Sequence, residues 1–195
     1  MSESVYLGDF PLVQPASPEH LSIVFSAGMA SKVHRWKNKN RSADFLADYF
    51  ANFFPGDEEA PKQTATQGEM RSAIGYIANE LLENAIKFNH DPACHMGIQL
   101  HLFNSSLVFV STNSMAPEDV EPFQVSIRKL LAGDPGEMYL ERLESNALSD
   151  GEGSGLGLLT MLHDYGAVLG WRFQAGHGPG GQPSVVLSTR VELRF

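Results

Sequence analysis

Three polar side chains near the middle of the chain have the types and the spacing of a phosphate and metal site. Glu80, Asn84 and Lys87 follow one another at steps of four and three residues, which brings a carboxylate, an amide and an ammonium group onto one stripe of a helix. Asn is a poor residue inside a helix, because its side chain competes for backbone hydrogen bonds. The presence of Asn at position 84 therefore indicates that this residue has a role in binding. The alternative is an ordinary solvated face with weakly paired charges.

The helix that carries this stripe is predicted over residues 70–88. Its apolar residues recur at steps of three and four and define one buried face: Met70, Ile74, Ile77, Leu81, Ala85 and Phe88. The polar stripe lies one position earlier in the sequence, which is about 100° around the helix. We therefore expect the three polar side chains to line the edge of the buried face.

A second candidate for phosphate binding is a glycine-rich segment far downstream. It consists of Gly153, Ser154, Gly155, Leu156 and Gly157. Glycines permit positive φ and close backbone approach, so that consecutive N–H groups can turn toward an anion. An apolar helix is predicted to follow over residues 158–165, with Gly166 as its left-handed cap. A glycine-rich loop that opens a helix is typical of phosphate sites; a flexible turn is the alternative.

In this order the two motifs resemble those of the GHKL (Bergerat-fold) ATP-binding family, which includes histidine-kinase ATPase domains, anti-sigma-factor serine kinases, gyrase B, Hsp90 and MutL. Residues 80–88 are similar to the family's N box and residues 153–158 to its second glycine box. The resemblance extends over residues 70–195. It implies that ATP and Mg²⁺ bind between the motifs, with the amides of residues 153–157 on the phosphates.

The resemblance also implies a role for each residue of the polar stripe. Asn84 would offer an amide oxygen to Mg²⁺, which prefers oxygen ligands and shares them with phosphates. Glu80 would orient or deprotonate the attacking hydroxyl or water, as the catalytic residue. Lys87 would reach a phosphate as a point charge.

One element of the family pattern is altered. The family carries an Asp-x-Gly-x-Gly box at the end of a strand, and its Asp holds the adenine amino group. Here the predicted strand 107–110 continues into residues 111–116, Ser-Thr-Asn-Ser-Met-Ala, without that box. Asn113 is the candidate adenine contact, because its carbonyl can accept a hydrogen bond from the adenine amino group. Thr112 is the alternative.

The surroundings of the ATP site differ between members of the family. Gyrase, Hsp90 and MutL carry transducer domains for which this chain is too short, and the helical-hairpin phosphoacceptor domain of sensor histidine kinases is missing. A stand-alone module similar to the anti-sigma-factor serine kinases remains. The altered glycine box and an extra N-terminal strand and helix resemble the SiaB-type switch kinases. The implied function is a serine/threonine protein kinase that phosphorylates a small regulatory partner in a signalling switch. Family habit also implies a homodimer.

Two other functions stay open at this point. One is a non-catalytic GHKL module that senses nucleotide or sequesters a partner protein, which the altered segment around Asn113 favours. The other is a slow ATPase without a protein acceptor.

Composition narrows the class of partner and the compartment. The 195 residues are 43% apolar, which is typical of one globular domain. A net charge of −9 argues against nucleic acid and anionic membranes as partners. Cys94 is the single cysteine, so no intrachain disulfide can form. No secretory leader or membrane-spanning run is predicted, so a cytoplasmic location is expected.

The periodicity along the chain predicts an α+β fold, a two-layer α/β sandwich with a mixed, mostly antiparallel sheet and helices on one face. Residues 1–195 are expected to form one GHKL-like domain. An extended arm over 1–19 precedes an extension over 20–66, and residues 114–153 are expected to form the ATP lid.

Smaller elements are predicted as follows. Strands are expected at 21–25, 98–102, 107–110, 168–173 and 185–195, helices at 45–53 and 138–148, a solvated basic loop around 32–41, and polar connections at 57–67 and 176–181.

Three other kinds of site are disfavoured by spacing or context. His90, Asp91, Cys94 and His95 have no recognised zinc spacing. Ser154 and His163 do not sit in the strand–elbow context of a hydrolase. The glycine segment also lacks the parallel βαβ unit that a dinucleotide-binding motif requires.

Overall fold

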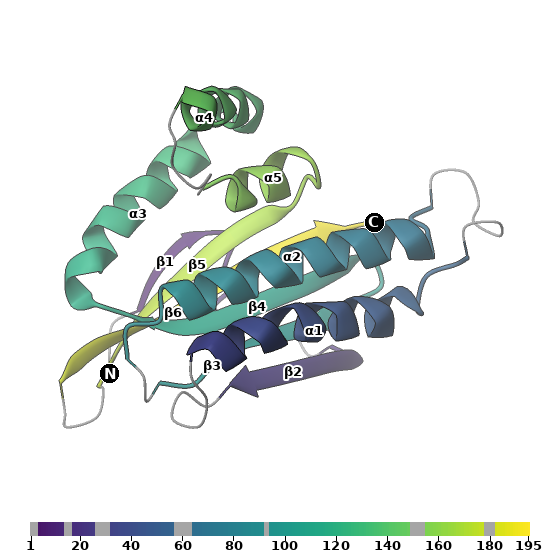
Figure 1. The fold of residues 1–195 in the computed structure, drawn as a ribbon, viewed down its shortest axis with the longest axis horizontal. Coiled ribbons are helices and arrows are strands. Elements are labelled where there is room, and N and C mark those ends of the chain that lie inside the picture. Colours follow the sequence, from purple (N-terminus) through teal and green to yellow (C-terminus); the bar gives the residue numbers. More distant parts are fainter. Residues whose placement is uncertain are drawn as a thin grey trace.

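One antiparallel sheet organises the protein, with its strands in the order β1-β5-β6-β4-β3-β2 (Figure 1). The computed structural model describes residues 4–13, 17–25, 32–56, 64–91, 94–148, 155–177 and 182–195. Its elements are β1 (Ser4–Gly8), β2 (Glu19–Phe25), α1 (Lys32–Ala51), α2 (Gln67–Lys87), β3 (Met96–Leu102), β4 (Ser106–Met115), α3 (Pro117–Ala132), α4 (Pro135–Leu148), α5 (Gly157–His163), β5 (Val168–His177) and β6 (Pro183–Arg194).

The central pair of strands fixes which side chains face the helices. β4 pairs with β6 in an unbroken register from Ser106↔Arg194 to Met115↔Val185. Side chains alternate along a strand, so the core residues Leu107 and Phe109 define the helix-covered face of β4. Every strand pair among the described residues is antiparallel. The sheet was expected to be mixed and mostly antiparallel, and in this part of the chain it is entirely antiparallel.

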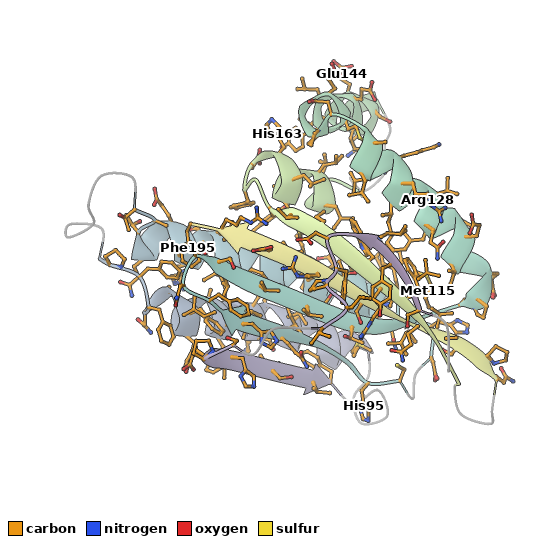
Figure 2. All side chains as sticks on the ribbon, turned by 180° about the vertical axis from the view of Figure 1, so that it is seen from behind. His95, Met115, Arg128, Glu144, His163 and Phe195 are labelled. Atoms are coloured by element: carbon orange, nitrogen blue, oxygen red, sulfur yellow. The ribbon has the colours of Figure 1, made fainter. Side chains whose placement is uncertain are left out.

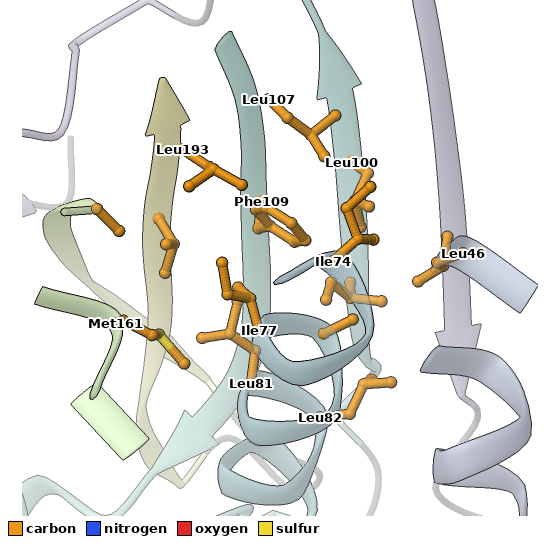
Figure 3. Close-up of a cluster of buried hydrophobic side chains, with 14 of the residues drawn as sticks. Leu46, Ile74, Ile77, Leu81, Leu82, Leu100, Leu107, Phe109, Met161 and Leu193 are labelled. Carbon is orange, nitrogen blue, oxygen red and sulfur yellow. The ribbon is translucent and has the colours of Figure 1, made fainter. Parts of the chain in front are cut away.

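The helix α2 lies on the middle of the sheet and supplies most of the core. It begins with a capping box in which Thr66 and Glu69 each bond to the other's backbone N–H. Figure 3 shows Ile74, Ile77 and Leu81 pointing from α2 toward the strands, and all three are at most 1% exposed. Full burial of such a side chain stabilises by about 1.5–3 kcal/mol. The predicted buried face is therefore confirmed from Met70 to Ala85, whereas Phe88, which was predicted to belong to it, follows the last turn of α2 and is 53% exposed.

The remaining helices lie on the same face of the sheet. α1 runs beside α2, whereas α3, α4 and α5 gather over the side that carries β5 and β1 (Figure 1). Ile127 of α3 and Met161 of α5 join the core, and Phe123 of α3 packs edge-on against Phe173 of β5. The predicted two-layer α/β sandwich with helices on one face is thus confirmed.

Figure 2 shows the molecule from behind, from the side of the sheet opposite the helices. A network of charged side chains lies on this face. Arg190 of β6 is 7% exposed and binds the carboxylates of Asp9 and Glu192 at 3.0 Å each. Burial alone raises the pKa of Glu192, but hydrogen bonds from Arg194 and Arg190 outweigh it and hold this pKa below its ordinary value. The network fastens the segment after β1 to β6.

Several predicted elements are confirmed: strand 21–25, helix 70–88, the hairpin of β3 and β4, strand 168–173 and the final strand. Gly166 has φ +57°, as expected of a left-handed cap. Much of the two polar connections, residues 57–63 and 178–181, lies outside the described residues. Among the described helices, none has the length and hydropathy required to cross a membrane.

Three expectations about local structure were wrong. The arm 1–19 contains β1, because its backbone completes the edge of the sheet beside β5. The basic stretch 32–41 forms the first half of α1 rather than a loop. Helix α3 was not predicted, because Pro117 and Pro122 break its pattern; Pro117 lies in its first turn, where proline is tolerated.

Candidate functional site

The two predicted motifs meet at one point, where α2 passes the start of α5. A methyl group added to Gly157 would lie only 2.2 Å from Oε2 of Glu80 and 3.1 Å from its carboxyl carbon. The Glu80 carboxylate thus lies directly against the Gly157 backbone, and any larger residue at 157 would displace it. Glycine at this position allows the close approach of the carboxylate, and its φ angle is not in the left-handed region.

The environment of Glu80 favours its neutral form. Its side chain is half-buried, and burial is the main cause that raises its pKa above the ordinary value of 4.5. The Glu83 carboxylate, three residues later, raises the pKa further, while the Lys39 ammonium group of α1 acts in the opposite direction. A carboxyl group with a raised pKa in a site candidate is typical of general bases.

Aromatic residues reinforce the contact between α2 and α5. Tyr76 of α2 stacks on Tyr165, with ring centroids 5.5 Å apart, and it shares a side-chain hydrogen bond with Thr160. Burial is the main cause that raises the pKa of Tyr76. Sequence analysis missed Tyr76, although it lies four residues before Glu80 and extends the same stripe by one turn.

The glycine segment is only partly described. Gly153 and Ser154 lie outside the described residues, and Leu156 is half-buried immediately before α5. Gly155 has φ +101°, which a residue with a side chain rarely adopts. An added Cβ there would lie 2.7 Å from a guanidinium nitrogen of Arg142, so α4 packs against this glycine. The predicted lid interval therefore touches the predicted phosphate loop.

The other two members of the stripe lie in the last turns of α2. Asn84 is half-exposed, and Lys87 is exposed with its ammonium group 5.3 Å from the centre of the Phe88 ring. Both lie beyond Glu80, toward the end of the helix, so the structure keeps them on the predicted edge. No described contact joins either side chain to residues 155–157.

The two candidates for adenine binding point to opposite faces of β4. Asn113 continues the alternation of Leu107 and Phe109 and lies on the helix-covered face, where it is 4% exposed. Thr112 belongs to the other face, opposite Gly97 of β3. Of the two candidates, Asn113 therefore faces the helices, and Thr112 does not. The Asn113 amide nitrogen donates to Ser114 O at 3.0 Å, which leaves its carbonyl directed away from that bond.

A loop after α2 fixes the end of β4 in place. The Asn89 carbonyl accepts hydrogen bonds from the backbone and the hydroxyl of Ser114, at 2.9 and 2.8 Å. The Ser114 hydroxyl in turn accepts one from the Asp91 backbone N–H at 2.6 Å. Because these bonds tie the end of β4 to the end of α2, Asn113 and Asn84 lie at the same end of the core.

A pocket of about 450 Å³ opens between α3, α4 and α5. Its lining is mainly apolar: Phe123, Ile127, Leu130, Met138, Leu158 and Leu159, with Ser126, Glu141, Arg142, Ser145 and Gly155. Among the described residues that were predicted to bind ATP, Gly155 alone lines it. Neither Glu80 nor Asn84 is among the lining residues.

The donor set along α2 suits a hard cation better than a soft one. Carboxylate and amide oxygens such as those of Glu80 and Asn84 are ligands that Mg²⁺ prefers. Within the described ranges, no group of three or more His, Cys, Asp or Glu side chains is arranged to hold a metal ion. A magnesium site here needs phosphate oxygens to complete it, which is what the sequence predicts for ATP.

Comparison with solved structures supports the fold. The chain is similar to a chain in the crystal structure of the SiaB–SiaC complex from Pseudomonas aeruginosa, with a TM-score of 0.55 and 14% sequence identity. The likeness covers 88% of this chain and 89% of that one. No family model and no curated protein matches the sequence. At this identity the likeness shows a shared architecture, the α+β sandwich described above.

The raised pKa of Glu80 predicts a stability cost at neutral pH. A carboxyl group whose pKa is raised by folding stabilises the fold below its ordinary pKa of 4.5, and this stabilisation is lost as the pH rises through the folded-state pKa. Glu80→Gln is therefore expected to raise the melting temperature at pH 7–8, and the gain should vanish near pH 4. Thermal unfolding across that range measures it, with exposed Glu144→Gln as control. A gain that persists at pH 4 contradicts this explanation.

The contact between the two motifs predicts energetic coupling. Gly157→Ala is expected to be less favourable in the native chain than in a Glu80→Ala background, by up to about 1 kcal/mol, because the new methyl group must displace the far end of the flexible Glu80 side chain. In the Glu80→Ala background this cost is gone, and the better helix propensity of alanine should make the change neutral or stabilising. Urea unfolding of the two single variants and the double variant tests this. Gly56, which has open space around its Cα, supplies the control Gly56→Ala, whose effect should be independent of Glu80. Additive energies for Gly157 and Glu80 disprove the contact.

Proposed function

We propose that this chain is a GHKL-type regulatory serine/threonine protein kinase, which binds ATP and Mg²⁺ and phosphorylates a small partner protein in a cytoplasmic signalling switch. The observation that carries the proposal is the contact between Glu80 and Gly157. It brings a carboxylate with a raised pKa to a glycine turn, two features that lie 77 positions apart (157 − 80) in the sequence. Phosphoryl transfer needs the phosphates held and the attacking hydroxyl oriented, and a glycine turn beside a carboxylate supports both roles.

The proposed step is an in-line displacement at the γ-phosphorus of ATP. The hydroxyl oxygen of a Ser or Thr of the partner forms a bond to that phosphorus, and the bond from the phosphorus to the β,γ-bridging oxygen breaks, so that ADP leaves. The Glu80 carboxylate takes the proton of the attacking hydroxyl. A raised pKa makes this carboxylate a stronger proton acceptor than an exposed one.

Other residues of the site would bind rather than react. Asn84 would hold Mg²⁺ through its amide oxygen, and the ion when bound supplies charge neutralisation for the phosphates. Backbone N–H groups of residues 155–157, with those of Gly153 and Ser154, would hold the phosphates, and Lys87 would add a positive charge. The carbonyl of Asn113 would accept the hydrogen bond of the adenine amino group.

Support for a lid comes from the packing of α4. Its Arg142 guanidinium lies against Gly155, whose positive φ permits this approach. A phosphate bound at the glycine turn would therefore lie near both Arg142 and the start of α5. Such a contact would hold α4 against the glycine turn when ATP binds.

Support for a protein partner comes from the fold. The similar chain was crystallised in a complex of two proteins, SiaB and SiaC. Acidic net charge of this chain favours a partner with basic character over nucleic acid or an anionic membrane.

The kinase proposal predicts transfer of phosphate that depends on Glu80. With labelled ATP, Mg²⁺ and the protein encoded by a neighbouring gene, the native chain should label the partner. Glu80→Ala should reduce the rate by about 10²–10⁴-fold and leave ATP affinity within a few-fold, because Glu80 acts on the hydroxyl and not on the nucleotide. Exposed Glu144→Ala is the control. Bound ATP without any transfer to the partner rejects the kinase function, and phosphate release without transfer indicates a slow ATPase.

A non-catalytic module is the second candidate, and one observation favours it. The segment that replaces the first glycine box is buried and satisfied internally, with Asn113 bonded to Ser114 O and Ser114 bonded to Asn89. Polar groups that already have hydrogen-bond partners within the protein contribute less to the binding of adenine.

Calorimetry separates the two candidates. A kinase is expected to bind ATP in the presence of Mg²⁺ at millimolar nucleotide or below, and Asn84→Ala should weaken that binding by at least 10-fold, while Asn52→Ala on the surface of the α1 end should not. If neither ATP nor ADP binds at millimolar concentration, the partner-sequestering function holds instead.

A further inference from the structure

A lysine of α1 is buried beside the candidate catalytic edge of α2. Lys39 is only 4% exposed, and its ammonium nitrogen lies 2.6 Å from Oε2 of Glu83. Burying an ammonium group removes its hydration, which is costly unless a charged partner compensates. An ion pair of this kind contributes little net stability compared with apolar residues of the same volume. Its presence at this point of the interface therefore calls for a role other than stability.

The position of Glu83 connects this lysine to the candidate site. Glu83 lies three residues after Glu80, so their carboxylates are neighbours on one side of α2. Two carboxylates at this spacing repel each other, and Glu80 is in addition half-buried against Gly157. The charge of Lys39, which binds Glu83 and also acts on Glu80, offsets the repulsion and partly opposes the effect of burial on the Glu80 carboxylate.

We propose that Lys39 is a positioning residue for Glu80: by binding Glu83, the α1 lysine holds its charge beside the Glu80 carboxylate and fixes that group against the glycine turn. This inference rests on the proposed function, in which Glu80 is the base. It assigns to α1, which belongs to the N-terminal extension, a direct electrostatic role in the site (Figure 1).

The charged and titratable groups around Glu80 support the assignment. Glu83 and Lys39 are the groups whose charges shift the pKa of Glu80, and they do so in opposite directions. The Glu80 charge acts on Tyr76, one turn earlier on α2, and so do Tyr165, which follows α5, and Tyr139 of α4. Of these groups, the lysine alone carries a positive charge.

A simple clamp between two helices is the competing explanation, and the chain contains its matched control. Arg71 of α2 binds Asp48 of α1 at 2.6 Å, in the same interface, but with both side chains more than half exposed. This second ion pair has the same length and joins the same helices. It lies nine residues before Glu80 (80 − 71) on α2, more than two turns away.

The first test is a double-mutant cycle on phosphate transfer. Lys39→Met is expected to lower kcat by about 10–100-fold, with a smaller effect on the KM for ATP, as is typical of residues that orient a reacting group. Lys39→Arg should restore most of the rate because it keeps the charge. In a Glu80→Gln background, Lys39→Met should change the residual rate by less than about twofold. Asp48→Asn should leave kcat unchanged.

The second test does not depend on activity. In protein labelled with ¹³C at the glutamate carboxyl groups, the NMR signal of Glu80, assigned by its loss in Glu80→Gln, should move in Lys39→Met and in Glu83→Gln but not in Asp48→Asn. Glu83→Gln changes a residue that is one-third exposed, so it keeps the test valid if Lys39→Met does not fold.

The two tests separate this inference from the function on which it rests. If the native protein transfers no phosphate but the Glu80 signal still moves in Lys39→Met, the kinase function is refuted and the positioning role is retained. The positioning role is overturned if Lys39→Met lowers the rate equally in the native and Glu80→Gln backgrounds. It is also overturned if the Glu80 signal stays in place in both Lys39→Met and Glu83→Gln.

Discussion

The packing of α2 on the sheet is the constraint on which the rest of the structure depends. Ile74, Ile77 and Leu81 are buried against the strands (Figure 3), so α2 cannot rotate about its axis without exposing them. Residues at the edge of that apolar face are therefore held at fixed positions. Glu80 is one of them, and its carboxylate meets α5 because both helices are fixed to the same sheet. Rigid elements position reacting groups more accurately than loops do.

The junction of α1 and α2 contains charged side chains at positions where they contribute little to stability. Glu80 and Glu83 lie half-buried on neighbouring positions, and Lys39 is buried opposite them. Apolar side chains would pack the junction of α1 and α2 with less loss of hydration. Local rules of folding are broken in this way mainly where function requires it. The junction thus differs in kind from the Arg190 network on the opposite face, where each carboxylate has an arginine within 3.0 Å.

Much of the fold could be predicted from the sequence, whereas the site could be predicted only in part. Regular periodicity identified α2 and β6, whereas a continuous apolar run identified β4, which is buried on both faces. β1 was missed because an edge strand of five residues has little pattern of its own and is defined by its partner. The alternation of Leu107 and Phe109, extended along β4, places Asn113, the first candidate, on the helix-covered face and Thr112, the alternative, on the other. The contacts of Glu80 with Gly157 and of Lys39 with Glu83 join distant segments, so no local pattern reports them.

The order of strands has a consequence for how the chain folds during synthesis. Ser4 pairs with Gln174, so β1 leaves the ribosome long before the strand that receives it. The sheet cannot be completed in the order of translation, and both β1 and the inner edge of β4 wait for β5 and β6. Pairings between such distant segments fold slowly and expose unpaired strand edges in the meantime. Completion of the sheet therefore depends on the synthesis of residues 168–195, and a ribosomal pause just before them would prolong the exposure of the unpaired strands to chaperones and to aggregation.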